Sequence, residues 1–437
     1  MTFLDSCATE EEKANIELLQ DNLLGMKKSM GDIFDLRKEH PDSLVYNIHA
    51  AGLQLFSETP KDLEKVEDML EKAESLANTP WSKGVVEGFR LLQQGKDEEA
   101  GAKLTEIIKE NKWDVFTCRL CMDIYFNMGM QKEMMATADL AWEVYSEHPL
   151  FQSAYAFCLE QVGRLDEAEE LAKIAVTTRQ DNPWGHHCLA HVYETTGRVK
   201  DGLAYMESAK HLWDDTIIDF INSHNYWHLA LFYVAVGRDS EAVELFKEYV
   251  WNTKESPGIQ LNAISLLWRL SLRGVEVSDD AWEEVLNYAR PHLRSHLQTF
   301  QDLHYSICLA VCKDEEEMKE FEATMPSEGR WSLLRKANEI LKAFYFENNA
   351  KKAVQLFEDV GIDQGEDAQT QVSNLAHGFI GLGGSNAQRG MLDHFLLVCS
   401  ASCCNEKLMK RLCSRLRGQE SFKAYLQQKL YRGLCLV

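Results

Sequence analysis

The sequence contains few of the residues that interrupt helices. Among its 437 residues there are 25 glycines and 8 prolines, and no long stretch alternates apolar with polar residues as half-buried β-strands do. Apolar residues recur instead at intervals of three and four, the spacing of one face of an α-helix. The sequence therefore predicts an all-α protein.

Basic residues and long apolar runs are also scarce. The chain carries 46 Lys and Arg against 69 Asp and Glu, a formal net charge of −23 at pH 7, and such a charge repels phosphate backbones and anionic lipid surfaces. We find no run near the ~18 apolar residues of a transmembrane helix, and no secretory signal in the first residues. We expect neither nucleic acid nor a membrane as a partner.

Cysteines are too few for a disulfide-stabilised fold. The chain has 12, and most fall in apolar helical surroundings, for example Cys158, Cys188 and Cys308. We expect reduced, buried thiols and a cytoplasmic protein. The single C-x-x-C, Cys118 to Cys121, has no second copy to complete a zinc site, so we interpret it as core packing.

Glycines recur at a fixed period in the first half of the chain. They are spaced 34 residues apart at Gly95, Gly129, Gly163 and Gly197. This is the period of tetratricopeptide repeats, in which helix pairs stack into a superhelix. We expect each glycine to follow the end of a helix in the left-handed conformation. A further unit follows at Gly237, and the extra residues before it, around 212–222, predict a lengthened loop or a short extra turn.

The repeat period predicts one continuous architecture. We expect an α-α superhelix, a tetratricopeptide-like solenoid of antiparallel helix pairs that is either open or closed on itself. The array covers 1–437, with N-terminal helices in 1–80, five repeat units in 81–256, and degenerate helix pairs and a C-terminal cap in 257–437. Outside the regular repeats the apolar spacing predicts helices at 9–28, 42–56, 60–77, 259–272, 279–290, 296–312, 314–323, 330–346 and 350–358.

Two histidine pairs lie in the fourth and fifth repeats. The pairs are His187 with His191 and His224 with His228, and in tetratricopeptide repeats these positions of the first helix face the concave groove. Side chains four residues apart share one helix face, so both imidazoles of a pair can bind one metal ion. Two pairs on neighbouring helices can converge on one divalent metal ion, with zinc, iron or manganese as candidates, or hold two.

Other residues are candidates for the same pocket. Trp227 lies between the histidines of its pair, and Arg389 offers two parallel donors to a carboxylate or a phosphate. Glycines before Arg389 allow backbone amides to approach such an anion. Besides the four histidines, the candidate pocket residues are His49, Glu194, Trp227, Asp302, His304, Asn386, Gln388 and Arg389.

Three strings in the sequence resemble the tetratricopeptide repeat protein 38 family. They run from Ala190 to Glu194 (A-H-V-Y-E), from His224 to His228 (H-N-Y-W-H) and from Gly383 to Arg389 (G-G-S-N-A-Q-R). The similarity extends over nearly the whole chain. It implies a cytosolic helical-repeat fold, and it carries over no catalytic residue.

The sequence leaves two classes of function open. The first is a scaffold without chemistry that binds a protein or peptide partner on its concave face. The second is a small-molecule-binding protein or metal-dependent enzyme with a histidine-rich pocket in repeats four and five. Groove positions of earlier repeats are mixed: Ser82, Val85 and Phe89, then Phe116, Arg119 and Asp123, then Leu150, Ser153 and Phe157. Polar residues concentrate in repeats four and five, which favours a closed pocket or a groove buried by the superhelix. Histidines that only pack and form hydrogen bonds are the alternative to any site.

Overall fold

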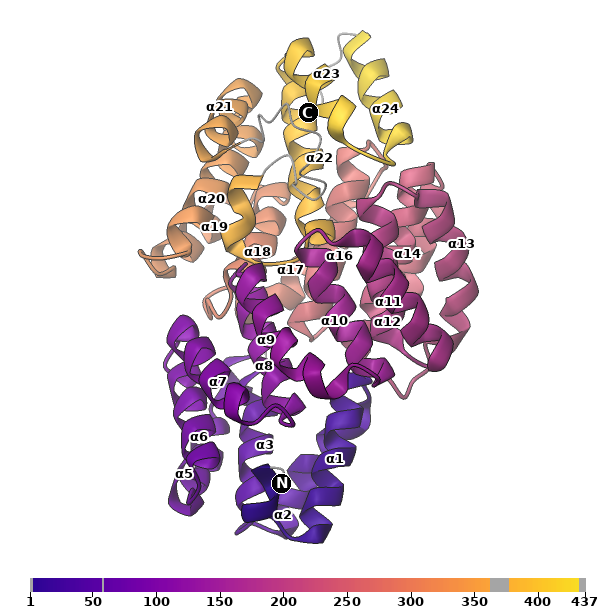
Figure 1. Ribbon diagram of the computed structural model, residues 1–437. Coiled ribbons are helices and arrows are strands. Elements are labelled where there is room, and N and C mark those ends of the chain that lie inside the picture. The colour runs from indigo at the N-terminus through magenta and orange to yellow at the C-terminus, as the bar shows by residue number, and fades with distance from the viewer. Residues whose placement is uncertain (1–2, 57–58, 362–376, 432–437) are drawn as a thin grey trace. The chain divides into compact units, whose positions relative to one another are not determined.

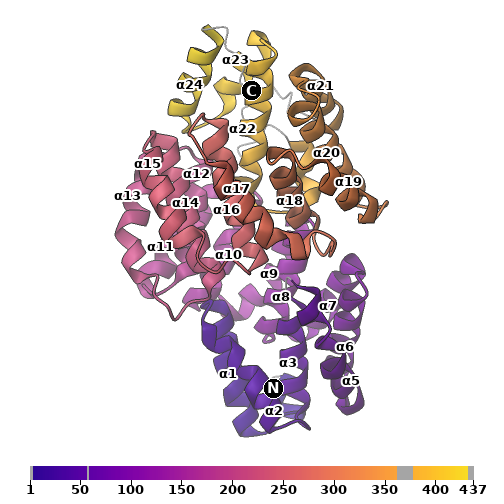
Figure 2. The same cartoon turned by 180° about the vertical axis from the view of Figure 1, so that it is seen from behind.

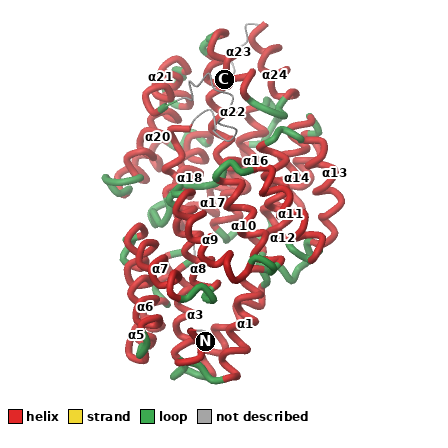
Figure 3. Tube along the Cα trace, in the orientation of Figure 1, coloured by secondary structure: helices red, strands yellow, loops and turns green. Residues whose placement is uncertain are grey.

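The computed structural model describes residues 3–56, 59–361 and 377–431 (Figure 1, and from behind in Figure 2). Within these ranges the secondary structure is helical, and the β-structure consists of one isolated bridge between Lys27 and Ile217 (Figure 3). The predicted all-α repeat fold is confirmed. No helix among the described residues is long and apolar enough to cross a membrane.

The chain divides into two compact units. Unit 1 comprises Met1–Cys188 and Leu212–Ile221, and unit 2 comprises Leu189–His211 and Asn222–Val437. The boundary runs through two helices, α12 (Pro183–Thr195) and α14 (Asp219–Val236). The last predicted residues of the C-terminal cap, 432–437, lie outside the described residues.

Unit 1 holds the N-terminal helices and the most regular repeats. Its 3-10 helices are η1 (Phe3–Ser6) and η2 (Lys28–Asp32). Its α-helices are α1 (Glu10–Leu24), α2 (Ile33–Glu39), α3 (Leu44–Leu55), α4 (Pro60–Leu63), α5 (Val66–Leu76), α6 (Pro80–Gln93), α7 (Asp97–Glu110), α8 (Val115–Asn127), α9 (Gln131–Tyr145), α10 (Pro149–Gln161) and α11 (Leu165–Thr178). The helix expected at 9–28 ends at Leu24, because Gly25 caps α1 and the chain turns there.

The turn glycines adopt the predicted left-handed conformation. The φ angles of Gly95, Gly129, Gly163, Gly197 and Gly237 lie between 70° and 84°. At Gly163 the turn is closed by two backbone hydrogen bonds, from Gly163 to the Glu160 carbonyl and from Arg164 to the Leu159 carbonyl, both 2.9 Å long. This pattern ends a helix with its last carbonyls paired, so the periodic glycines set where each helix pair turns.

Small residues let neighbouring helices approach closely, both within a pair and between consecutive pairs. A Cβ atom at Gly88 would lie 2.5 Å from Leu104, and one at Gly202 would lie 2.4 Å from Phe232. Real Cβ atoms do not approach so closely, so these positions need glycine for packing rather than for backbone conformation.

Unit 2 holds the later helix pairs. After α12 and α14 its α-helices are α13 (Val199–Ala209), α15 (Asp239–Leu245), α16 (Pro257–Leu272), α17 (Asp279–Ala289), α18 (Thr299–Val311), α19 (Glu315–Thr324), α20 (Trp331–Tyr345), α21 (Ala350–Val360), α22 (Asn386–Ser402), α23 (Glu406–Arg415) and α24 (Glu420–Tyr431). Short 3-10 and π segments are η3 (Lys210–Leu212), η4 (Phe246–Val250, a π-helix), η5 (Arg290–His292) and η6 (His377–Leu382). The extra residues between repeats four and five form η3 and the loop after it, as predicted.

Helices α14, α16, α18 and α22 form the interior of unit 2. Almost every residue of α16 is buried, and so are twelve of the thirteen residues of α18. A helix that is covered on all sides must bury its polar side chains as well as its apolar ones. These helices therefore carry buried histidines, asparagines and arginines, and those residues define the candidate site.

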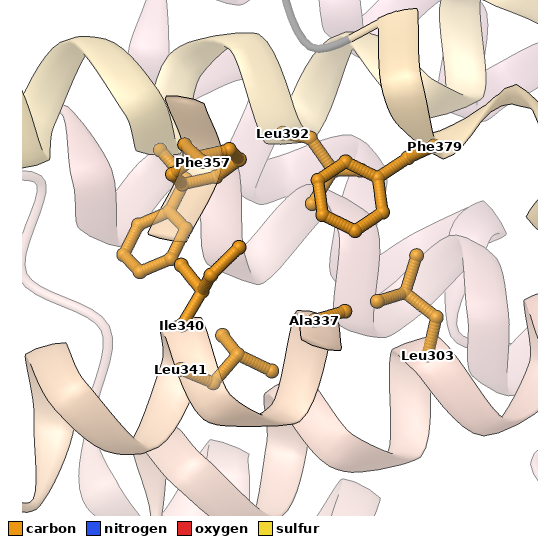
Figure 4. Close-up of a pocket in the computed structure, with 8 residues that line it drawn as sticks. Leu303, Ala337, Ile340, Leu341, Phe357, Phe379 and Leu392 are labelled. Atoms are coloured by element: carbon orange, nitrogen blue, oxygen red, sulfur yellow. The ribbon is translucent and has the colours of Figure 1, made fainter. Parts of the chain in front are cut away.

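A small apolar cavity occupies another part of this interior (Figure 4). Every residue that lines it is apolar: Leu303, Ala337, Ile340, Leu341, Phe357, Phe379, Leu392 and Phe395. A cavity with no polar lining offers no hydrogen bond to a polar ligand, so the candidate polar site is a separate feature.

Candidate metal centre

Two helices carry the paired histidines. Helix α12 begins at Pro183, where Asn182 accepts a hydrogen bond of 3.0 Å from the backbone N–H of Gly185 through its Oδ1 atom. His187 and His191 then lie one turn apart on one face of α12, as His224 and His228 do on α14. All four side chains are buried.

The histidine rings come together in three dimensions. His191, His224 and His228 each offer a ring nitrogen, and these atoms lie within 4.8 Å of one another. His187 lies one turn before His191 on the continuous helix α12, but it belongs to unit 1. We call His191, His224 and His228, which all belong to unit 2, the imidazole group. Among the described residues it is the one group of histidine, cysteine, aspartate or glutamate side chains with metal-binding spacing.

A chain of hydrogen bonds fixes the orientation of His224. Its Nδ1 atom lies 2.7 Å from Oδ1 of Asn262, and Nδ2 of Asn262 donates over 3.1 Å to the hydroxyl of Ser223. That hydroxyl donates in turn to the carbonyl of Val250 over 2.8 Å. Because the Asn262 oxygen is an acceptor, Nδ1 of His224 carries the proton. The other ring nitrogen, Nε2, is left with the lone pair that a metal ion needs.

A carboxylate lies beside His228. Oε2 of Glu194 is 3.4 Å from Nδ1 of His228. The ring of His228 packs edge-on against His191 and His224, with ring centres 4.7 and 4.9 Å away. A carboxylate next to a metal-binding imidazole raises its basicity and orients it, and protein metal sites commonly have this arrangement.

Burial keeps the imidazole group in the form that binds metals. Desolvation lowers the pKa of His224 to about 3, although the hydrogen bond that its ring donates to Asn262 raises it. A neutral imidazole is the metal ligand, whereas an imidazolium is not. His224 is therefore ready to coordinate an ion throughout the physiological pH range.

Arg269 of α16 lies next to the imidazole group, although it was not predicted from the sequence as a site residue. Its guanidinium carbon lies 5.3 Å from the centre of the Trp227 ring. Trp227 in turn stacks on His224 with ring centres 4.9 Å apart and an angle of 10°. A single arginine in the apolar run from Ile264 to Leu272 was the available signal, because a charge in a fully buried helix needs a partner.

Two other predicted site residues lie elsewhere in unit 2. Asp302 of α18 contacts His296, with 2.6 Å between Oδ2 and Nδ1. The Nδ1 atom of His304 is 2.8 Å from the carbonyl oxygen of Phe300, one turn earlier on α18. Burial raises the pKa of Asp302 to about 6 and lowers that of His304 to about 4. Neither residue belongs to the imidazole group.

His49 lies in unit 1, far from the others in sequence. Its Nδ1 atom is 2.7 Å from the carbonyl of Val45, one turn earlier on α3, and its ring packs against Phe116 at 4.5 Å. Desolvation lowers its pKa. These contacts describe a buried packing histidine.

The glycine-rich string before α22 builds the start of that helix. Ser385 and Gln388 form a capping box, in which each side chain pairs with the backbone of the other. Arg389 donates to the carbonyls of Gly383 and Gly384, and over 2.8 Å to Oδ1 of Asn386. The described contacts of Asn386, Gln388 and Arg389 therefore hold the loop in place.

Comparisons with known proteins add to this picture at the level of the fold. No family model matches the chain. Among solved structures, a monomeric mutant of IFIT1 with Gppp-AAAA is similar over 93% of this chain and 96% of that one, with 13% identity and a TM-score of 0.45. The helix pairs and their turn glycines define this chain as a tetratricopeptide-like helical repeat protein.

Proposed function

We propose that this repeat protein binds a divalent transition metal ion through the imidazole group. The observation that supports the proposal is the proximity of the buried imidazole nitrogens of His191, His224 and His228 in unit 2, all within 4.8 Å of one another. Imidazole is a preferred ligand of zinc, copper, nickel and iron, whereas manganese prefers oxygen ligands. Zinc is therefore the ion that we expect the site to take first.

The distances fit a tetrahedral zinc site after a small movement. Zinc binds imidazole nitrogens at about 2.0–2.1 Å, so ligand nitrogens in such a site lie about 3.4 Å apart. The widest separation in the group, 4.8 Å, has to close by ~1.4 Å, which small rotations of the side chains achieve. The hydrogen bond that His224 donates to Asn262 already orients one of the rings, and the Glu194 carboxylate lies beside His228.

The burial of the groove positions weakens the case for an extended peptide site. Val85, Phe116 and Leu150 were expected to face the groove, and all three are buried. Arg119 and Phe157, at other groove positions, are buried as well. A peptide needs such positions exposed to solvent, so a focal pocket for an ion or a small molecule fits the chain better than a scaffold for an extended partner.

We further propose that the chain is a member of the tetratricopeptide repeat protein 38 family. Two of the three strings that resemble the family contain candidate ligands of the site: His191 with Glu194 in the first, and His224 with His228 in the second. The proposed metal function rests on the geometry and is independent of this membership.

Metal analysis tests the proposal. The protein is purified without chelators and without a nickel-affinity tag, and zinc, copper, nickel, iron and manganese are quantified per chain by mass spectrometry. We expect close to one equivalent of zinc in the wild type. Metal contents far below one equivalent, together with no saturable zinc uptake by the chelator-treated protein, would refute the proposal.

A further inference from the structure

A buried positive charge beside the imidazole group is not neutralised by the chain. Arg269 is almost completely buried. Its guanidinium donates to neutral acceptors: the hydroxyl and carbonyl of Ser265 and the carbonyls of Ala387 and Gln388. Among the described residues no carboxylate forms an ion pair with it. Buried arginines normally have such a partner, because an isolated charge in the interior is costly.

Arg269 stays charged at neutral pH. Burial lowers its pKa to about 10, and the carboxylates of Glu194 and Asp393 raise it from a distance. Neither carboxylate contacts the guanidinium, so an anionic ligand could pair with it as a carboxylate of the chain normally does.

A buried donor at the same place lacks an acceptor. Trp227 is 1% exposed, and its indole Nε1–H has no hydrogen-bond partner. The ring of Trp227 contacts both His224 and His228, with ring centres 4.9 and 4.7 Å apart. An unpaired buried N–H costs about 1–3 kcal/mol, and an oxygen of a bound anion would remove this cost.

From these observations we infer that the imidazole group and Arg269 form one site for a metal ion together with a small carboxylate anion. This inference rests on the proposed metal function. The carboxylate takes the remaining position on the ion, and Arg269 and the Trp227 indole N–H select for its negative charge and its oxygen acceptors. A carboxylate is the group that normally pairs with a buried arginine.

Cobalt and acetate are the probes that test the inference. Chelator-treated protein is loaded with Co²⁺, whose visible absorption bands report the ligands of the ion. Sodium acetate is then titrated against sodium chloride at equal ionic strength, with inorganic phosphate as a separate arm. We expect acetate to shift the bands saturably in the wild type, and chloride and phosphate to have no such effect.

Substitutions assign the response to Arg269. Arg269→Gln should keep the cobalt bands and weaken acetate binding by ~10-fold or more, the typical effect of losing a charge-assisted hydrogen bond. Trp227→Phe keeps an aromatic ring but lacks the N–H, and it should also weaken acetate binding. This variant tests the anion site if Arg269→Gln does not fold. The matched control is Arg273→Gln, at the C-cap residue that follows α16, where Arg273 donates to Ser421 over 2.8 Å; it should bind acetate as the wild type does.

The outcomes separate this inference from the metal proposal. Cobalt bands without an acetate response, or with equal acetate affinity in Arg269→Gln and Trp227→Phe, would overturn the carboxylate site and leave the metal site standing. A saturable response to phosphate alone would also overturn it. If no cobalt bands appear, the metal proposal fails. The anion site is then tested by measuring the rise in the melting temperature of the protein when acetate is added. An equal rise in wild type and Arg269→Gln would then refute it.

Discussion

Two buried arginines show how the two units differ. Arg119 of α8 in unit 1 lies 5.0 Å from the ring centre of Trp184, and Arg269 of α16 in unit 2 lies 5.3 Å from that of Trp227. Both guanidinium groups are buried. Arg119 forms an ion pair with Asp123, one turn later on its own helix, whereas Arg269 has only neutral hydrogen-bond partners.

The same contrast holds for the buried histidines. His49 in unit 1 contacts a carbonyl of its own helix. His224 in unit 2 is oriented by Asn262 of another helix, and the rings of His191 and His228 lie near it. His49 thus has the contacts of a packing residue, whereas a gathering of imidazoles is typical of a ligand site.

The largest expected effect is the loss of metal binding from unit 2. A double variant, His224→Ala with His228→Ala, should abolish zinc uptake, because it removes both ligands that α14 supplies. His49→Ala in unit 1 is the matched control and should leave zinc uptake unchanged. Calorimetric titration of the chelator-treated proteins with zinc measures both, and circular dichroism checks that the helices are intact. If the double variant binds zinc as tightly as the control, the imidazole group is not the site.

The next effect concerns the arginines themselves. Arg119→Met should lower the free energy of unfolding by about 2–3 kcal/mol, because it leaves the Asp123 carboxylate without its partner. Arg269→Met leaves no contacting carboxylate unpaired, so we expect a change within ~1 kcal/mol in the metal-free protein. Urea unfolding of the two variants compares them directly. Equal losses would show that both arginines are ordinary structural ion-pair residues.

Acid should destabilise both units, and unit 2 more strongly. Burial lowers the folded-state pKa of His49, His304 and His394, and Arg269 lowers the last two further. The unfolded chain then binds more protons below pH 6.5, so the stability that these neutral histidines contribute is lost as the pH falls. The raised pKa of Asp302, about 6, has the opposite effect and stabilises the folded state as the pH falls between about pH 6 and pH 4. This contribution comes from one group, whereas the loss of stability comes from three histidines.

Denaturation with urea at pH 7.5 and pH 5.5 measures this dependence. We expect a net loss of about 2–3 kcal/mol at the lower pH, from roughly 1 kcal/mol for each histidine less the contribution of Asp302. His304→Phe should reduce the loss more than an exposed control, His211→Phe. An unchanged stability between the two pH values would contradict the assignment of these histidines as buried and neutral.

The smallest expected effect is on zinc affinity when the orientation of the His224 ring is no longer fixed. Asn262→Leu removes the hydrogen bond to His224 but none of the imidazoles, and we expect it to weaken zinc binding by roughly 10-fold. The comparable change in unit 1, Asn182→Leu, removes the acceptor at the start of α12 and should affect helix stability more than zinc affinity. Calorimetric titration distinguishes the two. An unchanged zinc affinity in Asn262→Leu would show that His224 binds the ion without the orienting hydrogen bond to Asn262.

The sequence predicted the repeat architecture because that information is local. The turn at Gly163 follows from a residue that tolerates positive φ, and the shared face of His224 and His228 follows from their spacing. Arg269 and Asn262 were missed because α16 begins at Pro257, beyond which the 34-residue period no longer gives a register. Contacts between helices far apart in the sequence depend on how the chain packs, which spacing alone does not specify.

Anomalous diffraction at the zinc absorption edge would test the metal site most directly. Crystals of the chelator-treated protein are grown with one equivalent of zinc, and the anomalous difference map is calculated. We predict one strong peak about 2.0–2.1 Å from ring nitrogens of His191, His224 and His228. A map with no peak there, or with its strongest peak on exposed side chains elsewhere, would contradict the existence of a metal centre in unit 2.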